Sequence, residues 1–119
     1  MVNRGIRSNI RRRLGALGLL TVAIAACAVD ATPSDDGATL YSRQCIACHG
    51  AERQGVDGLG VTLVGSELVM SSDADELVAF LKVGRMPNDP ASLTGGVMPG
   101  FSWMPEADLR QIVEYLAGN

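Results

Sequence analysis

The chain of 119 residues is poor in histidine, in aromatic residues and in long apolar runs. Its single histidine and single close pair of cysteines cannot supply the four ligands of an ordinary zinc site. It offers no second histidine and no nucleophile–base pair, which argues against an enzyme. Its longest apolar run, 14–26, has 13 residues, whereas a membrane-spanning helix needs about 20. The length fits one domain.

The first 27 residues have the organisation of an export signal, because five arginines precede residue 14 and the apolar run follows them. The stretch 24–27 (IAAC) resembles a bacterial lipobox, which implies cleavage before Cys27 and lipidation of its sulfur. The same stretch also fits ordinary signal-peptidase cleavage, and an uncleaved anchor is a further alternative. We therefore predict a signal peptide over 1–27 and an exported, lipid-anchored protein on the periplasmic side of a bacterial membrane, or a soluble periplasmic one.

A polar, acidic stretch, 28–36, follows the signal and predicts a flexible tether before the folded domain at 37–119. Nine coil residues span roughly 15–18 Å, enough to hold a small domain just off a membrane. From residue 28 onward the chain has five basic and 13 acidic residues, which gives a formal net charge of −8, compared with −3 for the whole chain. Such a domain repels phosphate backbones, which excludes nucleic acid and favours a partner with a basic docking patch.

Cys45-Ile46-Ala47-Cys48-His49 is the C-x-x-C-H pattern of covalent haem attachment. Two cysteines three positions apart lie on one helical face, so both sulfurs can bond the vinyl groups of one porphyrin. The adjacent His49 then supplies the proximal imidazole to the iron. A thioredoxin-like pair is the main alternative, but no βαβ pattern surrounds the motif. We therefore predict one haem c, attached through Cys45 and Cys48.

The mature sequence predicts three helices, over 36–45, 73–83 and 106–117, with glycine-rich loops 50–65 and 84–100 between them. Asp36 is a candidate N-cap, and Asp73 with Glu76 has the spacing of a capping box. Apolar residues recur at helical spacing in the second and third segments. No stretch alternates as a strand does. The expected class is all-α, with long loops wrapped around one large cofactor.

The sixth iron ligand must be sought among methionines, because the chain has no second histidine. Met98 is the favoured candidate, since it lies in the middle of a glycine-rich loop and Pro99 stiffens that loop. Met86 is the alternative, and Met104 or an open site comes after it. We interpret Met70 and Met104 as core residues.

These residues together resemble the class I cytochromes c over about 36–118. Gly37 and Tyr41 stand where that family has a glycine and an aromatic on its first helix, and Tyr115 stands where the last helix crosses them. Met98 lies 17 positions before Tyr115, as the family's axial methionine does. The segment 84–99 also looks like the corresponding segment of short bacterial cytochromes c that serve dehydrogenases. The resemblance implies the cytochrome c fold.

One departure from the family concerns the loop after the haem motif. The family usually has a proline there whose carbonyl accepts the N–H of the proximal histidine, two residues before a leucine. This chain has Val61 before Leu63. A valine carbonyl can accept the same bond, but the loop loses the stiffness of proline. Arg85 and Trp103 are candidate donors to a haem propionate, because their N–H groups suit a carboxylate.

Histidine and methionine ligation would leave the iron no site for a substrate, so the sequence predicts a one-electron carrier that exchanges electrons with a donor and an acceptor protein. Two alternatives remain. If Met98 binds weakly, the haem would bind or sense small ligands, and if the domain belongs to an assembly, it would be the cytochrome subunit of a membrane dehydrogenase or oxidase.

Overall fold

A computed structural model describes residues 33–118 as an all-α fold. Three helices are the long ones: α1 at Gly37–Gln44, α4 at Ala74–Val83 and α5 at Glu106–Ala117. Two short helices, α2 at Ile46–His49 and α3 at Glu67–Ser71, lie between them. The three predicted helices are therefore confirmed to within a residue at each end, whereas α2 and α3 were not predicted.

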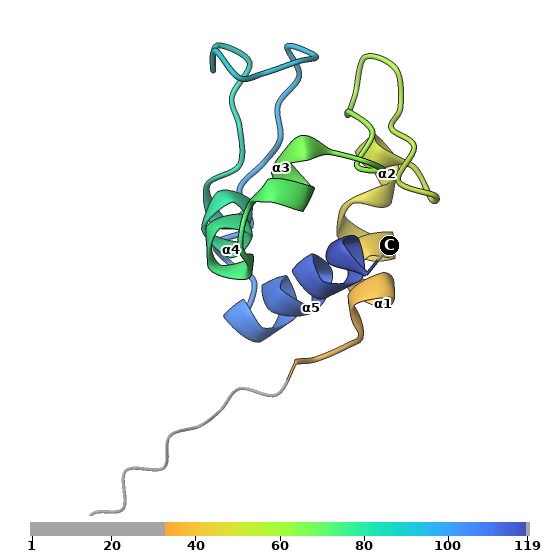
Figure 1. The fold of residues 1–119 in the computed structure, drawn as a ribbon, viewed down its shortest axis with the longest axis vertical. Coiled ribbons are helices and arrows are strands. Elements are labelled where there is room, and N and C mark those ends of the chain that lie inside the picture. The colour runs from red at the N-terminus through yellow and green to blue at the C-terminus, as the bar shows by residue number, and fades with distance from the viewer. Residues whose placement is uncertain (1–32, 119) are drawn as a thin grey trace, which may run out of the picture.

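The crossing of α1 and α5 joins the two ends of the domain (Figure 1). Gly37 lies where the two helices are closest, because a Cβ there would be 2.0 Å from the Gln111 carbonyl oxygen. The rings of Tyr41 and Tyr115 pack against each other with centroids 5.4 Å apart. The crossing implied by the resemblance, with its glycine and aromatic pair, is thus present.

Helix α4 begins as the sequence predicts. The Asp73 carboxylate accepts the amide of Glu76 at 2.8 Å, and the Glu76 carboxylate accepts the amide of Asp73 at 3.0 Å. This capping box satisfies two amides that the first turn leaves without helical partners. Apolar residues of α4 pack against α5. Together with residues of α1 and of the segment before α5, they form the hydrophobic core: Leu40, Leu77, Val78, Leu81, Phe101, Met104, Leu109, Ile112 and Val113.

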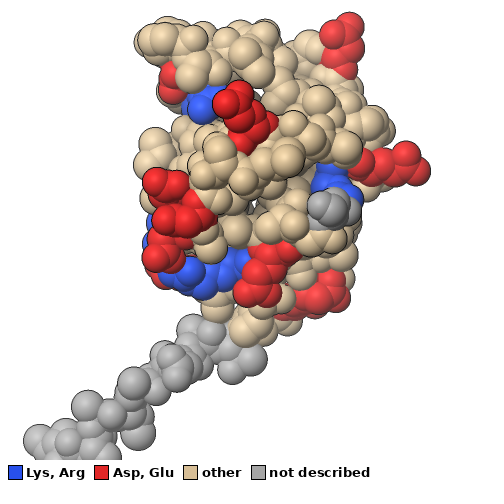
Figure 2. Space-filling view, viewed as in Figure 1, with Lys and Arg blue, Asp and Glu red and all other residues tan. Residues whose placement is uncertain are grey.

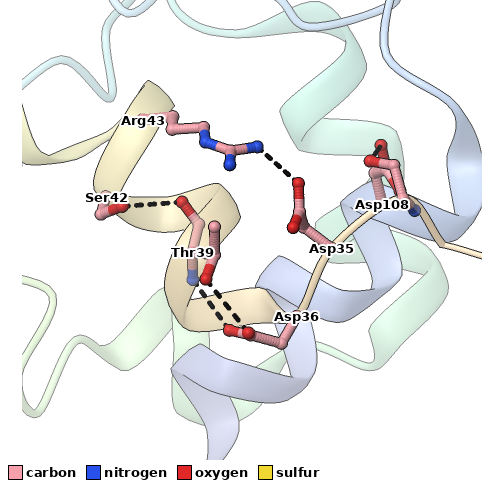
Figure 3. A network of polar contacts seen from close by, with 7 residues as sticks. Asp35, Asp36, Thr39, Ser42, Arg43 and Asp108 are labelled. Carbon is pink, nitrogen blue, oxygen red and sulfur yellow. Dashed lines mark hydrogen bonds and ion pairs between the residues drawn. The ribbon is translucent and has the colours of Figure 1, made fainter.

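The chain enters the fold beside the first turn of α5 (Figure 3). Ser34 donates from its amide and its hydroxyl to the buried Asp108 carboxylate, at 2.6 and 2.7 Å. Asp36 then caps α1 by accepting the Thr39 amide at 2.9 Å, as the sequence predicts. Asp35 pairs with Arg43 in the last turn of α1. The last residues before α1 are therefore fixed to the domain.

The two long loops lie at the end of the domain opposite to this entry point (Figure 1). None of the helices in the described region, 33–118, is long and apolar enough to cross a membrane. The predicted signal peptide, Cys27 and the residues 28–32 of the predicted tether lie outside the described residues.

Candidate functional site

Helices α1 and α2 meet at Cys45, which ends the first and begins the second. The Cys45 carbonyl accepts the amides of Cys48 at 3.2 Å and of His49 at 2.9 Å. This single turn brings both cysteines and the histidine to the wall of one cavity. The predicted attachment residues are therefore together in the fold.

The two cysteines are half-buried and are not bonded to each other. Burial, and then the neighbouring Cys48, raise the pKa of the Cys45 thiol to about 11. The nucleophilic cysteine of a thioredoxin-like pair has a lowered pKa, roughly 3.5–7.5. The environment of Cys45 is thus the opposite of what that alternative requires.

His49 is held by the loop that follows it. Its Nδ1 lies 2.7 Å from the Val61 carbonyl oxygen, and its own backbone carbonyl accepts the Gly55 amide at 2.7 Å. Because a carbonyl oxygen can only accept, Nδ1 must carry the proton. The lone pair of the neutral ring is then on Nε2, the tautomer that binds a metal. The valine carbonyl thus accepts the histidine N–H without a proline at this position.

Met98 lines the same cavity and lies in a short antiparallel bridge. Its amide and carbonyl pair with the carbonyl and amide of Arg85, at 2.8 Å each. Gly84 makes the approach possible, because a Cβ there would lie 2.3 Å from the Met98 carbonyl oxygen. Met98 is half-buried and packs against the core.

The other three described methionines lie outside this cavity wall. Met86 is 59% exposed and Met70 is 77% exposed, whereas Met104 is buried. The interpretation of Met104 as a core residue is confirmed. That of Met70 is wrong, because α3 is a short helix on the surface and leaves this side chain toward solvent.

The cavity consists of two adjoining parts of about 590 and about 120 Å³. Both parts are lined by Cys45, His49, Val61, Arg85, Leu93 and Met98. The remaining wall is mainly apolar and comes from α3, α4, α5 and the two long loops. The volume lies in the usual range of small-molecule and cofactor sites, about 300–1,000 Å³. A large, flat, apolar group with bonds to sulfur and nitrogen suits this cavity.

Residues 32–116 match the family described as cytochrome c oxidase, cbb3-type, subunit III. The chain belongs to this family of c-type cytochromes. It is 32% identical over 93 residues to the cbb3-type cytochrome c oxidase subunit CcoP of Cereibacter sphaeroides. It is 24% identical over 102 residues to the CcoP subunit of Rhodobacter capsulatus.

These matches cover about three quarters of the chain but only 28% and 31% of the two relatives, so the cytochrome spans less than a third of their length. A solved structure, the KustC0563 c-type cytochrome, superposes with a TM-score of 0.51 at 16% identity. The superposition covers 71% of this chain and 96% of the other. It supports the cytochrome c fold.

The residues present fit the haem that the family implies. Two sulfurs for covalent attachment, an imidazole with a free Nε2 and a thioether all line the cavity. Arg85 also lines both parts of the cavity; its Nε is buried without a hydrogen bond and lies 3.8 Å from Asp89. Trp103, in contrast, is 67% exposed and lines neither part.

Two contributions to the site were not predicted. Gly84 directly follows α4, and its lack of a side chain admits the Met98 segment. Arg53 was not singled out, although its carbonyl accepts the Leu63 amide at 2.8 Å and so holds the loop that carries Val61. The role of Gly84 could have been suspected from a glycine at the start of the loop that carries Met98, but no local pattern indicates the role of Arg53.

We predict that Gly84→Ala loosens the Met98 segment. The new Cβ meets the Met98 carbonyl, and the backbone φ of +73° disfavours any side chain. The amides of Arg85 and Met98 should then exchange with solvent faster, by roughly tenfold or more.

Gly95→Ala is the matched control for this exchange experiment. It has a similar φ of +67°, but a Cβ there has nothing within 4 Å. Equal effects of the two substitutions would mean that backbone strain, and not the contact with Met98, determines the loss.

Proposed function

We propose that this domain is a one-electron carrier with one haem c, attached through Cys45 and Cys48 and ligated by His49 and Met98. The observation that carries the proposal is that both candidate ligands line one cavity. His49 presents an unprotonated Nε2, and Met98 is the one methionine of the described region that lines the cavity. The bound haem iron would supply reversible one-electron oxidation and reduction.

The chain's own residues would set the properties of that centre. The Val61 carbonyl orients the His49 ring and increases its basicity as a ligand. The Arg85–Met98 bridge holds the thioether in place, and a thioether ligand raises the reduction potential. Arg85 is the candidate partner of a haem carboxylate, since it is the arginine that lines both parts of the cavity. Two strong-field ligands leave no position for a substrate.

An oxidase or dehydrogenase subunit is the second candidate, and it is favoured by the family match. The relatives are named as subunits of a cbb3-type oxidase, and the matched region is less than a third of each. In such an assembly the domain would still carry electrons and would not itself catalyse a reaction. The sensing alternative depended on a loosely held Val61 loop, and the 2.7 Å bond between His49 and Val61 weighs against it.

The proposed partner is a redox protein with a basic docking patch. Acidic side chains predominate on the face drawn in Figure 2, and blue side chains there lie beside red ones. Arg43, Lys82, Arg85 and Arg110 each pair with an acidic residue. Glu52, Asp57 and Glu67 are exposed and form no ion pair with the described residues. Glu67, on α3, lines the cavity, and Glu52 and Asp57 belong to the 50–65 loop, other residues of which also line it.

We further propose that Cys27 is the lipid anchor of an exported protein and that the tether runs from residue 28 to the start of the domain. The Ser34–Asp108 bonds would shorten its free part to residues 28–33, which span roughly 12–15 Å as coil. The chain enters at the end opposite to the two cavity loops (Figure 1). An anchored domain would therefore present its cavity away from the membrane, toward a partner in the periplasm.

The proposal predicts that the oxidised, haem-loaded protein shows the weak near-infrared band of methionine bound to ferric haem. Met98→Ala should abolish this band, because it removes the thioether. Met86→Ala should keep it, since Met86 is exposed and outside the cavity wall. Absence of the band from the unmodified protein, together with ready binding of carbon monoxide, would contradict the proposal and favour sensing.

The charge argument predicts that the triple variant Glu52→Gln, Asp57→Asn, Glu67→Gln is reduced more slowly by a cationic ruthenium ammine complex. A loss of a few-fold is expected at low ionic strength, because three charges near the cavity no longer attract the reagent. About 1 M salt should remove the difference, since the Debye length is then about 3 Å. Glu114→Gln is the control, on α5. An unchanged rate in the triple variant would argue against this docking face.

A further inference from the structure

The position of His49 depends on a loop that lacks a proline where one is expected. The Val61 carbonyl accepts the His49 Nδ1 proton, and the loop from Gly50 to Leu63 brings that carbonyl into place. Val61 has no ring to restrain its backbone, and its amide donates no hydrogen bond within the part of the chain that the structure describes. Another group must therefore restrain this loop.

Arg53 is the residue of this loop with the most unusual backbone. Its φ is 60°, which makes it the only described residue other than glycine with a positive φ. In this conformation its carbonyl accepts the Leu63 amide at 2.8 Å, the Val64 amide at 3.4 Å and the Thr62 hydroxyl at 3.2 Å. Three groups directly after Val61 are thus tied to one carbonyl oxygen.

The side chain of Arg53 is fixed on the last helix. Its guanidinium lies over the Tyr115 ring, 4.9 Å from the centroid, and Nη1 donates to the Tyr115 carbonyl at 3.3 Å. Tyr115 in turn packs on Tyr41, whose hydroxyl donates to the Gly50 carbonyl at 2.7 Å. Both ends of the segment from Gly50 to Arg53 are therefore attached to the crossing of α1 and α5.

The two roles of Arg53 depend on each other. A left-handed backbone is unfavourable for a residue with a side chain, so the loop would relax unless other contacts opposed it. A cation over an aromatic ring is attractive and opposes that relaxation. The contacts with Tyr115 thus maintain the conformation in which the Arg53 carbonyl holds residues 62–64.

We propose that Arg53 is a positioning residue for the proximal ligand: anchored on Tyr115, it fixes the loop that presents the Val61 carbonyl to His49. It performs the restraining function that a proline at position 61 would perform. Arg53 acts through Val61 and touches neither proposed ligand. The inference rests on the proposed function, because it takes His49 as the proximal ligand of a haem.

The test uses the haem-loaded protein and two readouts of the His49 bond. In Arg53→Ala, the Nδ1 proton of His49 should exchange with solvent faster, on the order of tenfold, because the loop opens more often. The midpoint potential should rise, since a weaker bond to Val61 makes the imidazole a less basic ligand. The near-infrared methionine band should stay, because Met98 belongs to the other loop.

Two further variants separate a specific effect on the His49 bond from a general loss of stability. Arg110→Ala removes an exposed arginine from α5 that pairs with Asp75 and Glu106, and it should change neither readout. Arg53→Lys keeps a cation near the ring and should give smaller changes of the same sign. It also serves as the test if Arg53→Ala does not fold.

A rescue experiment links the effect to Val61. Adding Val61→Pro to Arg53→Ala should restore slow exchange and the original potential, because the ring supplies the missing restraint. Unchanged exchange and potential in a folded Arg53→Ala protein would overturn the inference, and so would equal shifts in Arg110→Ala. If the unmodified protein lacks the methionine band, the proposed function fails instead, and the two failures are therefore distinguishable.

Discussion

The hydrogen bond from His49 Nδ1 to the Val61 carbonyl is the interaction on which the site depends. It fixes the tautomer of the only histidine, and it fixes the loop that lines one wall of the cavity. The histidine itself follows the two cysteines on a single helical turn. The proposed haem attachment at the two cysteines, the orientation of His49 and the conformation of the Val61 loop are therefore coupled. The crossing of α1 and α5 supports the residues that couple them.

The long elements could be predicted from the sequence because their signals are local. Asp36, Asp73 and Glu76 place two helix starts, and their side-chain bonds occur as expected. The apolar stripe of α5 is buried as its spacing predicts. The family is also confirmed, because the C-x-x-C-H motif and the glycine and aromatics of the crossing are separate signals that agree.

The rest of the site depends on contacts between residues distant in sequence. Helices α2 and α3 have four and five residues, too few for an apolar period to be recognised. For the same reason Met70 was assigned to the core, although it lies on the surface. The positive φ of Arg53 and its contact with Tyr115, 62 positions away, have no sequence pattern of their own. Such restraints become visible only in three dimensions.

The most direct test of the central claim is the methyl NMR spectrum of the reduced, haem-loaded protein with labelled methionines. The account predicts that the Met98 methyl signal is shifted strongly upfield, because a ligand over the haem face lies in the ring current. The signals of Met70, Met86 and Met104 should stay near their ordinary positions. A Met98 signal at its ordinary position would contradict the assignment of His49 and Met98 as the ligand pair, whether or not the signal of another methionine is shifted.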